Sequence, residues 1–224
     1  MLRKSLIAVA LLPLSSWSAG FYVGAGLGPD YGDFKQNARI TSQSFDARDK
    51  THLAGKGIFG TLFGGYAWNR DYWYLAGEVN GNISSLKFKS SNYEYVNSNF
   101  VNTNYKIRSN YGFSLLPGFQ YSDTFLFYAR AGYVNGNFKT STQDVSLANV
   151  NRHLDGFRCG LGIKQDITEH LSFRMEYSHL NYQKTRFSAF DNSVSKYTII
   201  DPSTNQVEFG IVYTFADKAV MITK

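Results

Sequence analysis

The sequence predicts an all-β chain that folds as an eight-stranded antiparallel up-and-down transmembrane β-barrel. Three observations predict this class. Eight segments have strand composition, rich in aromatic and β-branched residues. Within the segments, an apolar face alternates with a face of charged, Gly and Ser residues, a period of two. The gaps between segments alternate long and short, the pattern of bacterial barrels.

Composition excludes other classes. Of the 224 residues 17% are aromatic, 18% are charged and 20 are glycine. The charged fraction is low for a soluble domain, whose surface would have too few charged groups. The high aromatic content argues against a disordered chain. Mean hydropathy is −0.28, and the longest apolar run, Leu6–Leu14, contains Pro13, so a bundle of spanning helices of roughly 20 apolar residues each is excluded. Lysine and arginine form no cluster, so we expect no nucleic-acid partner.

Residues 1–20 predict a signal peptide. Met1–Lys4 is basic, Ser5–Leu14 is apolar and Ser15–Gly20 is made mostly of small residues, which are the three parts of an export signal. Trp17 disfavours cleavage after Ala19, because it would occupy the small-residue position three before the cut. We therefore expect cleavage near Ser18–Gly20, either after Ser18 or after Gly20. A buried N-terminal helix is the alternative. The mature chain, with a barrel over residues 21–215 and a short tail at 216–224, is expected to be exported.

The predicted strands and turns follow from the alternation and from turn residues such as Asn, Asp and Ser. The strands cover residues 20–28, 54–68, 73–87, 105–120, 125–138, 153–165, 171–185 and 203–215. Short turns lie at 69–72, 121–124 and 166–170, and long loops at 29–53, 88–104, 139–152 and 186–202. Pro117 lies within the fourth strand, where it cannot donate to a ladder, and predicts a bulge near that rim.

The apolar face is expected to point outward, into lipid. Strands of this length exceed the usual globular length and can cross a bilayer when tilted by roughly 45°. Aromatic residues gather near the short turns, where an interfacial girdle belongs. They are Trp68, Tyr72, Trp73, Tyr121, Phe125, Phe127, Phe173, Tyr213 and Phe215. A soluble sandwich or a lipocalin, with the apolar face inward, is the alternative.

Six ionisable residues on the polar face lie at about one height, near the middle of the membrane. They are Glu78, Arg130, Arg158, Arg174, Glu176 and Glu208. A lysine or arginine facing lipid at the midplane costs about 2–4 kcal/mol, so these side chains are expected to point inward. Three Glu and three Arg can neutralise one another, and an eight-stranded interior is just wide enough for side chains to fill. We therefore expect a structural salt-bridge belt in a plugged lumen; an ion path or gate is the alternative.

The two ends of the mature chain resemble the small outer-membrane β-barrel proteins of the opacity-protein and outer-membrane protein A-like group, a porin-like family. The opening run Gly20–Gly28 resembles their first strand. The ending is similar to the terminal-strand signal that the barrel-assembly machinery reads, with Glu208, Gly210, Tyr213 and Phe215 at the matching positions.

This resemblance implies a Gram-negative outer-membrane location and partners there: the assembly machinery, outer-membrane lipid and lipopolysaccharide. One departure is the tail Ala216–Lys224, since the family signal usually ends on its last aromatic. The tail is too short for a peptidoglycan-binding domain.

No residue is assigned a catalytic, cofactor-binding or metal-binding role. Gly24, Gly26 and Gly28 lack the spacing and the helix of a dinucleotide site. The four histidines lack paired spacing, and the single Cys159 makes no disulfide within the chain.

The enzyme alternative is a lipid A deacylase-like protein with a His-x-Ser pair. Next to His179, however, Asn181 occupies the nucleophile position, and the pair His170 and Ser172 begins at a short turn, at the wrong leaflet for lipid A.

The sequence therefore predicts a surface protein with an adhesin, host-interaction or membrane-structural role, carried by four outer loops. The loops Pro29–Leu53 and Asp191–Pro202 are the best candidates for contact with a host surface ligand. A deacylase-like enzyme and a narrow porin remain as alternatives.

Overall fold

The computed structural model describes residues 18–43, 46–94, 99–142, 151–191 and 194–215. The leader expected over residues 1–20 lies outside these ranges except for residues 18–20, which begin the first strand. The tail at 216–224 lies outside them entirely. Within the described ranges, no helix is long and apolar enough to span a membrane.

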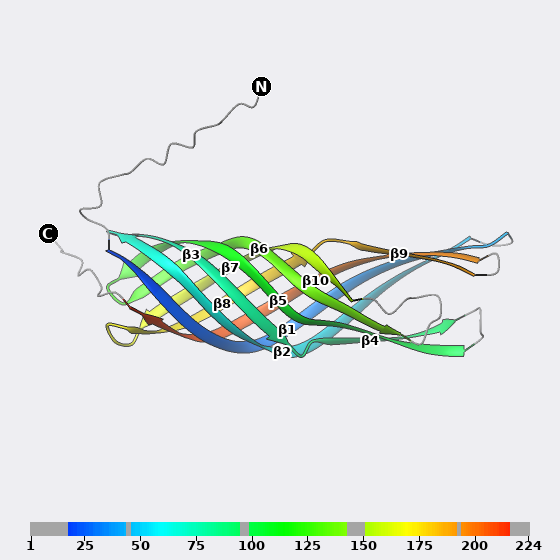
Figure 1. Cartoon of the computed structure of the whole chain (residues 1–224), viewed down its shortest axis with the longest axis horizontal. Helices are drawn as coiled ribbons and strands as arrows, with labels where there is room; N and C mark the ends of the chain where they lie inside the picture. The colour runs from blue at the N-terminus through cyan, green and yellow to red at the C-terminus, as the bar shows by residue number, and fades with distance from the viewer. Residues whose placement is uncertain (1–17, 44–45, 95–98, 143–150, 192–193, 216–224) are drawn as a thin grey trace, which may run out of the picture.

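The described chain forms one antiparallel sheet closed into a barrel (Figure 1). Its strands are β1 (Ser18–Thr41), β2 (Asp46–Arg70), β3 (Trp73–Ser84), β4 (Lys87–Glu94), β5 (Asn99–Ser122), β6 (Phe125–Thr142), β7 (Asn151–Asp166), β8 (Leu171–Tyr182), β9 (Thr185–Asp191) and β10 (Val194–Thr214). β4 continues β3 after a short break, and β9 continues β8. The ring thus has eight positions, and the predicted fold class is confirmed.

The sheet closes because β1 pairs on both of its edges. Its partners are β2 on one side and β10 on the other, where the register runs from Tyr22 opposite Thr214 to Thr41 opposite Ser195. The three short turns, β2–β3, β5–β6 and β7–β8, lie at the end of the barrel where β1 begins and β10 ends, which we call the turn end. In the β2–β3 turn Asp71 has a φ of 52°, a left-handed conformation that aspartate tolerates better than most residues.

Apolar side chains cover the outside of the barrel. On β3 the outward residues run from Trp73, 73% exposed, to Ile83, 71% exposed, while the residues between them point inward. Eleven residues of tilted strand span about 25 Å along the barrel axis, which is the height of the apolar band of outer-membrane barrels. We call this zone the lipid-facing band. Other members are Val23, Leu27, Ile58, Leu62, Val79, Phe113, Leu115, Leu161, Met175 and Phe209.

The aromatic residues near the short turns lie against one another on the outer surface. Tyr72 stacks on Phe119 with ring centroids 5.9 Å apart, and Tyr213 meets Phe215 edge-on at 5.2 Å. Tyr121 is 72% exposed, so its ring faces water or the membrane interface and is not packed in a protein core. These rings form a belt at the turn end, as the sequence predicted.

The long connections expected as loops are strands instead. Pro29–Leu53 belongs almost wholly to β1 and β2, and Asp191–Pro202 mostly to β10. Residues 88–104 contain β4 and the start of β5. The loop prediction was wrong because alternation continues through these segments, with inward residues such as Phe34 and Phe88 fully buried.

The strand extensions form a two-sheet structure beyond the lipid-facing band, which we call the head (Figure 1). One sheet has the order β2-β1-β10-β9, and the other contains β4, β5 and β6. Among the described residues, the last backbone pair joining the sheets on one side is Lys56 with Lys87. On the other side, the Gln183 amide donates to the Asp155 carbonyl at 2.7 Å.

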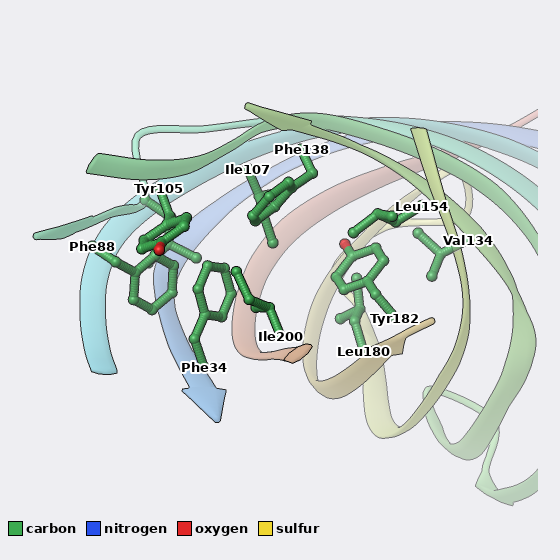
Figure 2. Close-up of a cluster of buried hydrophobic side chains, with 11 residues drawn as sticks. Phe34, Phe88, Tyr105, Ile107, Val134, Phe138, Leu154, Leu180, Tyr182 and Ile200 are labelled. Carbon is green, nitrogen blue, oxygen red and sulfur yellow. The ribbon is translucent and has the colours of Figure 1, made fainter. Parts of the chain in front are cut away.

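An apolar core lies where these two sheets face each other (Figure 2). Its buried members are Phe34, Leu86, Phe88, Tyr105, Ile107, Val134, Phe138, Leu154, Leu180, Tyr182 and Ile200. Phe34 from β1 stacks on Phe88 from β4 with ring centroids 3.7 Å apart. A Cβ at Gly32 would lie 2.0 Å from the Phe88 ring, so glycine is what lets this ring lie flat on β1. We call this cluster the head core.

Pro117 does not sit at a bulge, contrary to the sequence prediction. It lies opposite Leu75, and the β5–β6 register is the same at Leu115 and at Gly118. The register shifts lie instead between Ile107 and Asn110 and between Gln120 and Ser122. Proline removes one ladder donor, and here β5 accommodates that loss locally without an extra residue.

We expect Phe34→Ala to lower the free energy of unfolding by about 3–5 kcal/mol, because it removes a fully buried ring and leaves a cavity beside Phe88. Urea unfolding of the detergent-folded protein measures this. Tyr197→Ala, at a ring 40% exposed on the same sheet, is the control and should change stability far less. Equal unfolding of Phe34→Ala and the wild type would show that the head core does not stabilise the fold.

Candidate functional site

The six ionisable residues singled out in the sequence meet in the lumen. They come from five strands: Glu78 from β3, Arg130 from β6, Arg158 from β7, Arg174 and Glu176 from β8, and Glu208 from β10. Each is 3% exposed or less. Alternation turns all six inward because each has outward apolar neighbours in the lipid-facing band. We call them the lumen belt.

Glu78 is held by two arginines from across the lumen. Its Oε1 lies 2.6 Å from Arg130 Nη2, and its Oε2 lies 2.7 Å from Arg174 Nη1. The Tyr22 hydroxyl donates to the same Oε2 at 2.9 Å. A carboxylate that accepts several charged donors is well compensated for the loss of water.

Glu176 has an equally dense set of partners. Its Oε1 lies 2.8 Å from Arg130 Nε and 3.7 Å from Arg158 Nη2. The Ser178 hydroxyl donates to Oε1 at 2.6 Å, and the Tyr128 hydroxyl donates to Oε2 at 2.8 Å. Arg130 therefore bridges the carboxylates of β3 and β8.

Arg174 is the second bridge of the lumen belt. Besides Glu78 it contacts Glu208, whose Oε1 accepts from Nη2 at 2.6 Å and from Nε at 3.0 Å. Its guanidinium carbon lies 3.5 Å from the centroid of the Phe63 ring, a cation–π contact. Three carboxylates and three guanidinium groups thus form one connected, charge-balanced network.

Buried side chains close the lumen on both sides of the belt. Toward the turn end lies a buried cluster of Tyr22, Phe63, Ala67, Tyr74, Ala76, Leu116, Leu126, Tyr128 and Val212. Toward the head lie buried polar pairs, in which Ser84 donates to Asp30 at 2.6 Å and Asn82 to Asn110 at 2.6 Å. The head core lies beyond these pairs. Side chains therefore fill the interior from one end to the other.

The hydroxyl donors to the belt were missed by the sequence analysis. Ser178 lies two residues from Glu176 on the same face of β8, so its alternation position was a usable signal. Tyr22 and Tyr128 come from other strands, and their contacts with Glu78 and Glu176 depend on the barrel's register and diameter.

The expected assembly-signal residues occupy both faces of β10. Glu208 and Gly210 point inward, and a Cβ at Gly210 would lie 3.0 Å from Glu208 Oε1. Tyr213 and Phe215 are exposed on the outside at the turn end. The Phe215 amide donates to the Phe21 carbonyl at 2.9 Å, which ties the last residue of the barrel to the first strand.

The residues weighed for an enzyme do not assemble a nucleophile with a base. His179 lies on the outer face, where its Nδ1 is 2.8 Å from Asn205 Oδ1. Ser172 is fully buried in the lumen and donates to Asp166 at 2.5 Å. His170 lies instead in the β7–β8 turn, with Nδ1 3.1 Å from the Thr214 carbonyl oxygen.

We expect Arg174→Met to lower the free energy of unfolding by about 3–5 kcal/mol, because it leaves Glu208 as a buried, unpaired charge. The double variant R174M/E208Q should be more stable than the single variant, since it removes that charge. Urea unfolding at neutral pH measures both. The exposed Arg186→Met is the control and should stay within about 0.5 kcal/mol of wild type. Additive losses in the double variant would contradict a coupled network.

Comparisons with known proteins agree with this architecture. The chain is 27% identical over 205 residues to a 22 kDa outer membrane protein of Rhizobium leguminosarum bv. viciae, covering 91% of this chain and 80% of that protein. The fold is similar to that of OprG from Pseudomonas aeruginosa, with a TM-score of 0.53 at 13% identity over 90% of this chain and 99% of that one. Neisserial surface protein A aligns with a TM-score of 0.44 at 14% identity, over 88% and 99% of the two chains.

The family whose model matches the sequence is described as the outer membrane protein beta-barrel domain, and the match covers residues 5–215. The band height, the closed sheet and the short turns at one end fit that description. The chain belongs to this family of outer-membrane β-barrel proteins, and its place is the Gram-negative outer membrane.

Proposed function

We propose that this protein is a surface-display barrel, whose closed membrane part carries a rigid head that binds ligands outside the cell, as an adhesin or host-interaction protein does. Outer-membrane barrels keep their short turns in the periplasm, so the head faces outward. The observation that carries the proposal is the contrast between the two parts. The lumen is filled by side chains, while the strands continue past the lipid-facing band into a packed two-sheet head.

The head has the properties of a binding surface. The inner faces of its two sheets pack against each other in the head core, which holds the sheets in place. The outer faces are therefore available to bind a partner. Polar and charged side chains cover the outer face of the β1–β2 hairpin, including Lys35, Arg39, Arg48 and Lys50. A surface held by a core loses little conformational entropy when it binds.

One ion pair ties this hairpin together near its tip. Arg39 Nη2 lies 2.7 Å from Asp46 Oδ2, and Nε donates to Oδ1 at 2.9 Å. The hydrogen bonds from Arg39 and its charge lower the pKa of the Asp46 carboxyl below its usual value. The pair is therefore present at neutral pH and is lost only as the pH falls through that lowered pKa.

A headless variant tests the proposal. Short turns would replace residues 32–55, 87–107, 137–153 and 184–203, which leaves the lipid-facing band and the lumen belt in place. We expect the headless barrel still to shift its gel mobility on boiling but to lose most of the adhesion of expressing cells to host cells. R174M/E208Q, with an intact head and an altered belt, is the control and should adhere. Undiminished adhesion by headless cells would refute the proposal.

The two other function classes have separate readouts. A narrow porin requires an open lumen, so conductance steps from the intact protein in planar bilayers would contradict the filled interior. A deacylase changes its substrate, so a change in lipid A mass upon expression would support that reading over ours. We expect neither, because the lumen is filled and Asn181 stands where the nucleophile is needed.

A further inference from the structure

Four lysines on four successive strands lie directly opposite one another on the outer face of the barrel. Lys56 of β2 pairs with Lys87 of β4, Lys87 with Lys106 of β5, and Lys106 with Lys139 of β6. We call this set the lysine row. Nothing in the spacing of these residues along the chain indicates it, because only the register brings them together.

All four side chains point away from the protein. Phe88, next to Lys87, is fully buried, and so is Phe138, next to Lys139. Lys106 lies between Tyr105 and Ile107, which both face the head core. Alternation therefore directs each lysine outward, into the space beside the head.

Within the part of the chain that the structure describes, no ion pair neutralises the charge of the lysine row. Asp33 lies on the outward face of β1, opposite the residue of β2 that is two positions from Lys56. Among the described residues, no ion pair links Asp33 to Lys56. Like charges directly opposite across a sheet destabilise the pairing. Three such pairs in succession point to an anion that lies across them.

The row begins at the membrane surface and rises away from it. Lys56 stands two residues beyond Ile58, the last large apolar outward residue of β2, while Lys139 stands six residues beyond Tyr133 on β6. A tilted strand rises about 2.3 Å per residue along the barrel axis, so the row climbs from about 5 to about 14 Å above the band. With neighbouring strands about 4.8 Å apart, the row is about 14 Å long.

We propose that the lysine row binds the phosphorylated saccharide head group of lipopolysaccharide in the outer leaflet. A phospholipid carries its phosphate at one level, whereas a glycolipid with phosphates on its lipid A and inner-core sugars presents anions over a range of heights. The lysine row also spans a range of heights, so it matches the distribution of anions on the glycolipid. This inference rests on the lysine row, on the outer-membrane location and on the periplasmic placement of the short turns, and not on the proposed binding role of the head.

The test uses the full detergent-folded protein and its variant K87Q/K106Q/K139Q, titrated with lipopolysaccharide that carries lipid A and core phosphates. The temperature at which half of the protein loses its folded gel mobility reports binding. We expect the variant to bind roughly 100-fold more weakly, about fivefold for each lysine. K50Q/K184Q/R186Q removes three exposed charges elsewhere on the head, and it should bind within about threefold of wild type.

Further arms separate the source of the anion and the state of the fold. Dephosphorylated lipopolysaccharide, inorganic phosphate and phosphatidylglycerol should each fail to reproduce the rise in midpoint. Without lipid, the row variant should unfold at or above the wild-type midpoint, because the repulsion is relieved. The proposal is overturned if the row variant binds like wild type, if phosphatidylglycerol is as effective as lipopolysaccharide, or if the row variant is the less stable protein without lipid.

Discussion

The rest of the structure depends on charge balance in a closed lumen. Six ionised groups lie in a space filled by side chains, and a buried charge is tolerated only when it is paired. Some of the pairs join neighbouring strands, and others reach across the lumen. Arg130 of β6 reaches Glu78 of β3, and Arg174 of β8 reaches Glu78 as well as Glu208 of β10. The contact between Arg174 and Glu78 joins opposite walls of the barrel. Every strand that carries a paired charge therefore has its register fixed. A slip by one residue would turn that charge to lipid.

The layers on both sides of the lumen belt explain why the barrel is a support for the head. Aromatic and aliphatic side chains occupy the turn end of the lumen, and the head core occupies the other. The same alternation that faces apolar groups to lipid in the middle of each strand faces them inward in the head, where water surrounds the outside. On β1 and β5, the outward face is therefore apolar in the lipid-facing band, whereas the inward face is apolar in the head. The head can then stand in water without a separate domain.

Sequence reasoning predicted what the period of two determines locally. Glu78, Arg130 and Glu176 were placed inward because their chain neighbours are apolar, and the short turns were found from residues such as Asn69 and Asp71. The strand ends were not predicted. Phe34, Phe88 and Ile200 lie in segments rich in polar residues and interrupted by Pro29 and Pro202, and their burial needs a facing sheet from a distant part of the chain. The hydroxyl contacts of Tyr22 and Tyr128 and the lysine row depend likewise on register, which one sequence does not display.

The extension of alternating strands into the head limits how its surface can vary among strains. On β1, Phe34, Gln36 and Ala38 are buried, whereas Lys35, Asn37 and Arg39 face outward. Substitutions that the fold tolerates can therefore accumulate at alternate positions only. Insertions of a single residue within these strands would turn the core outward, so they would be eliminated. Sequence variation in the head would appear as stripes along the strands, with changes in length confined to their tips.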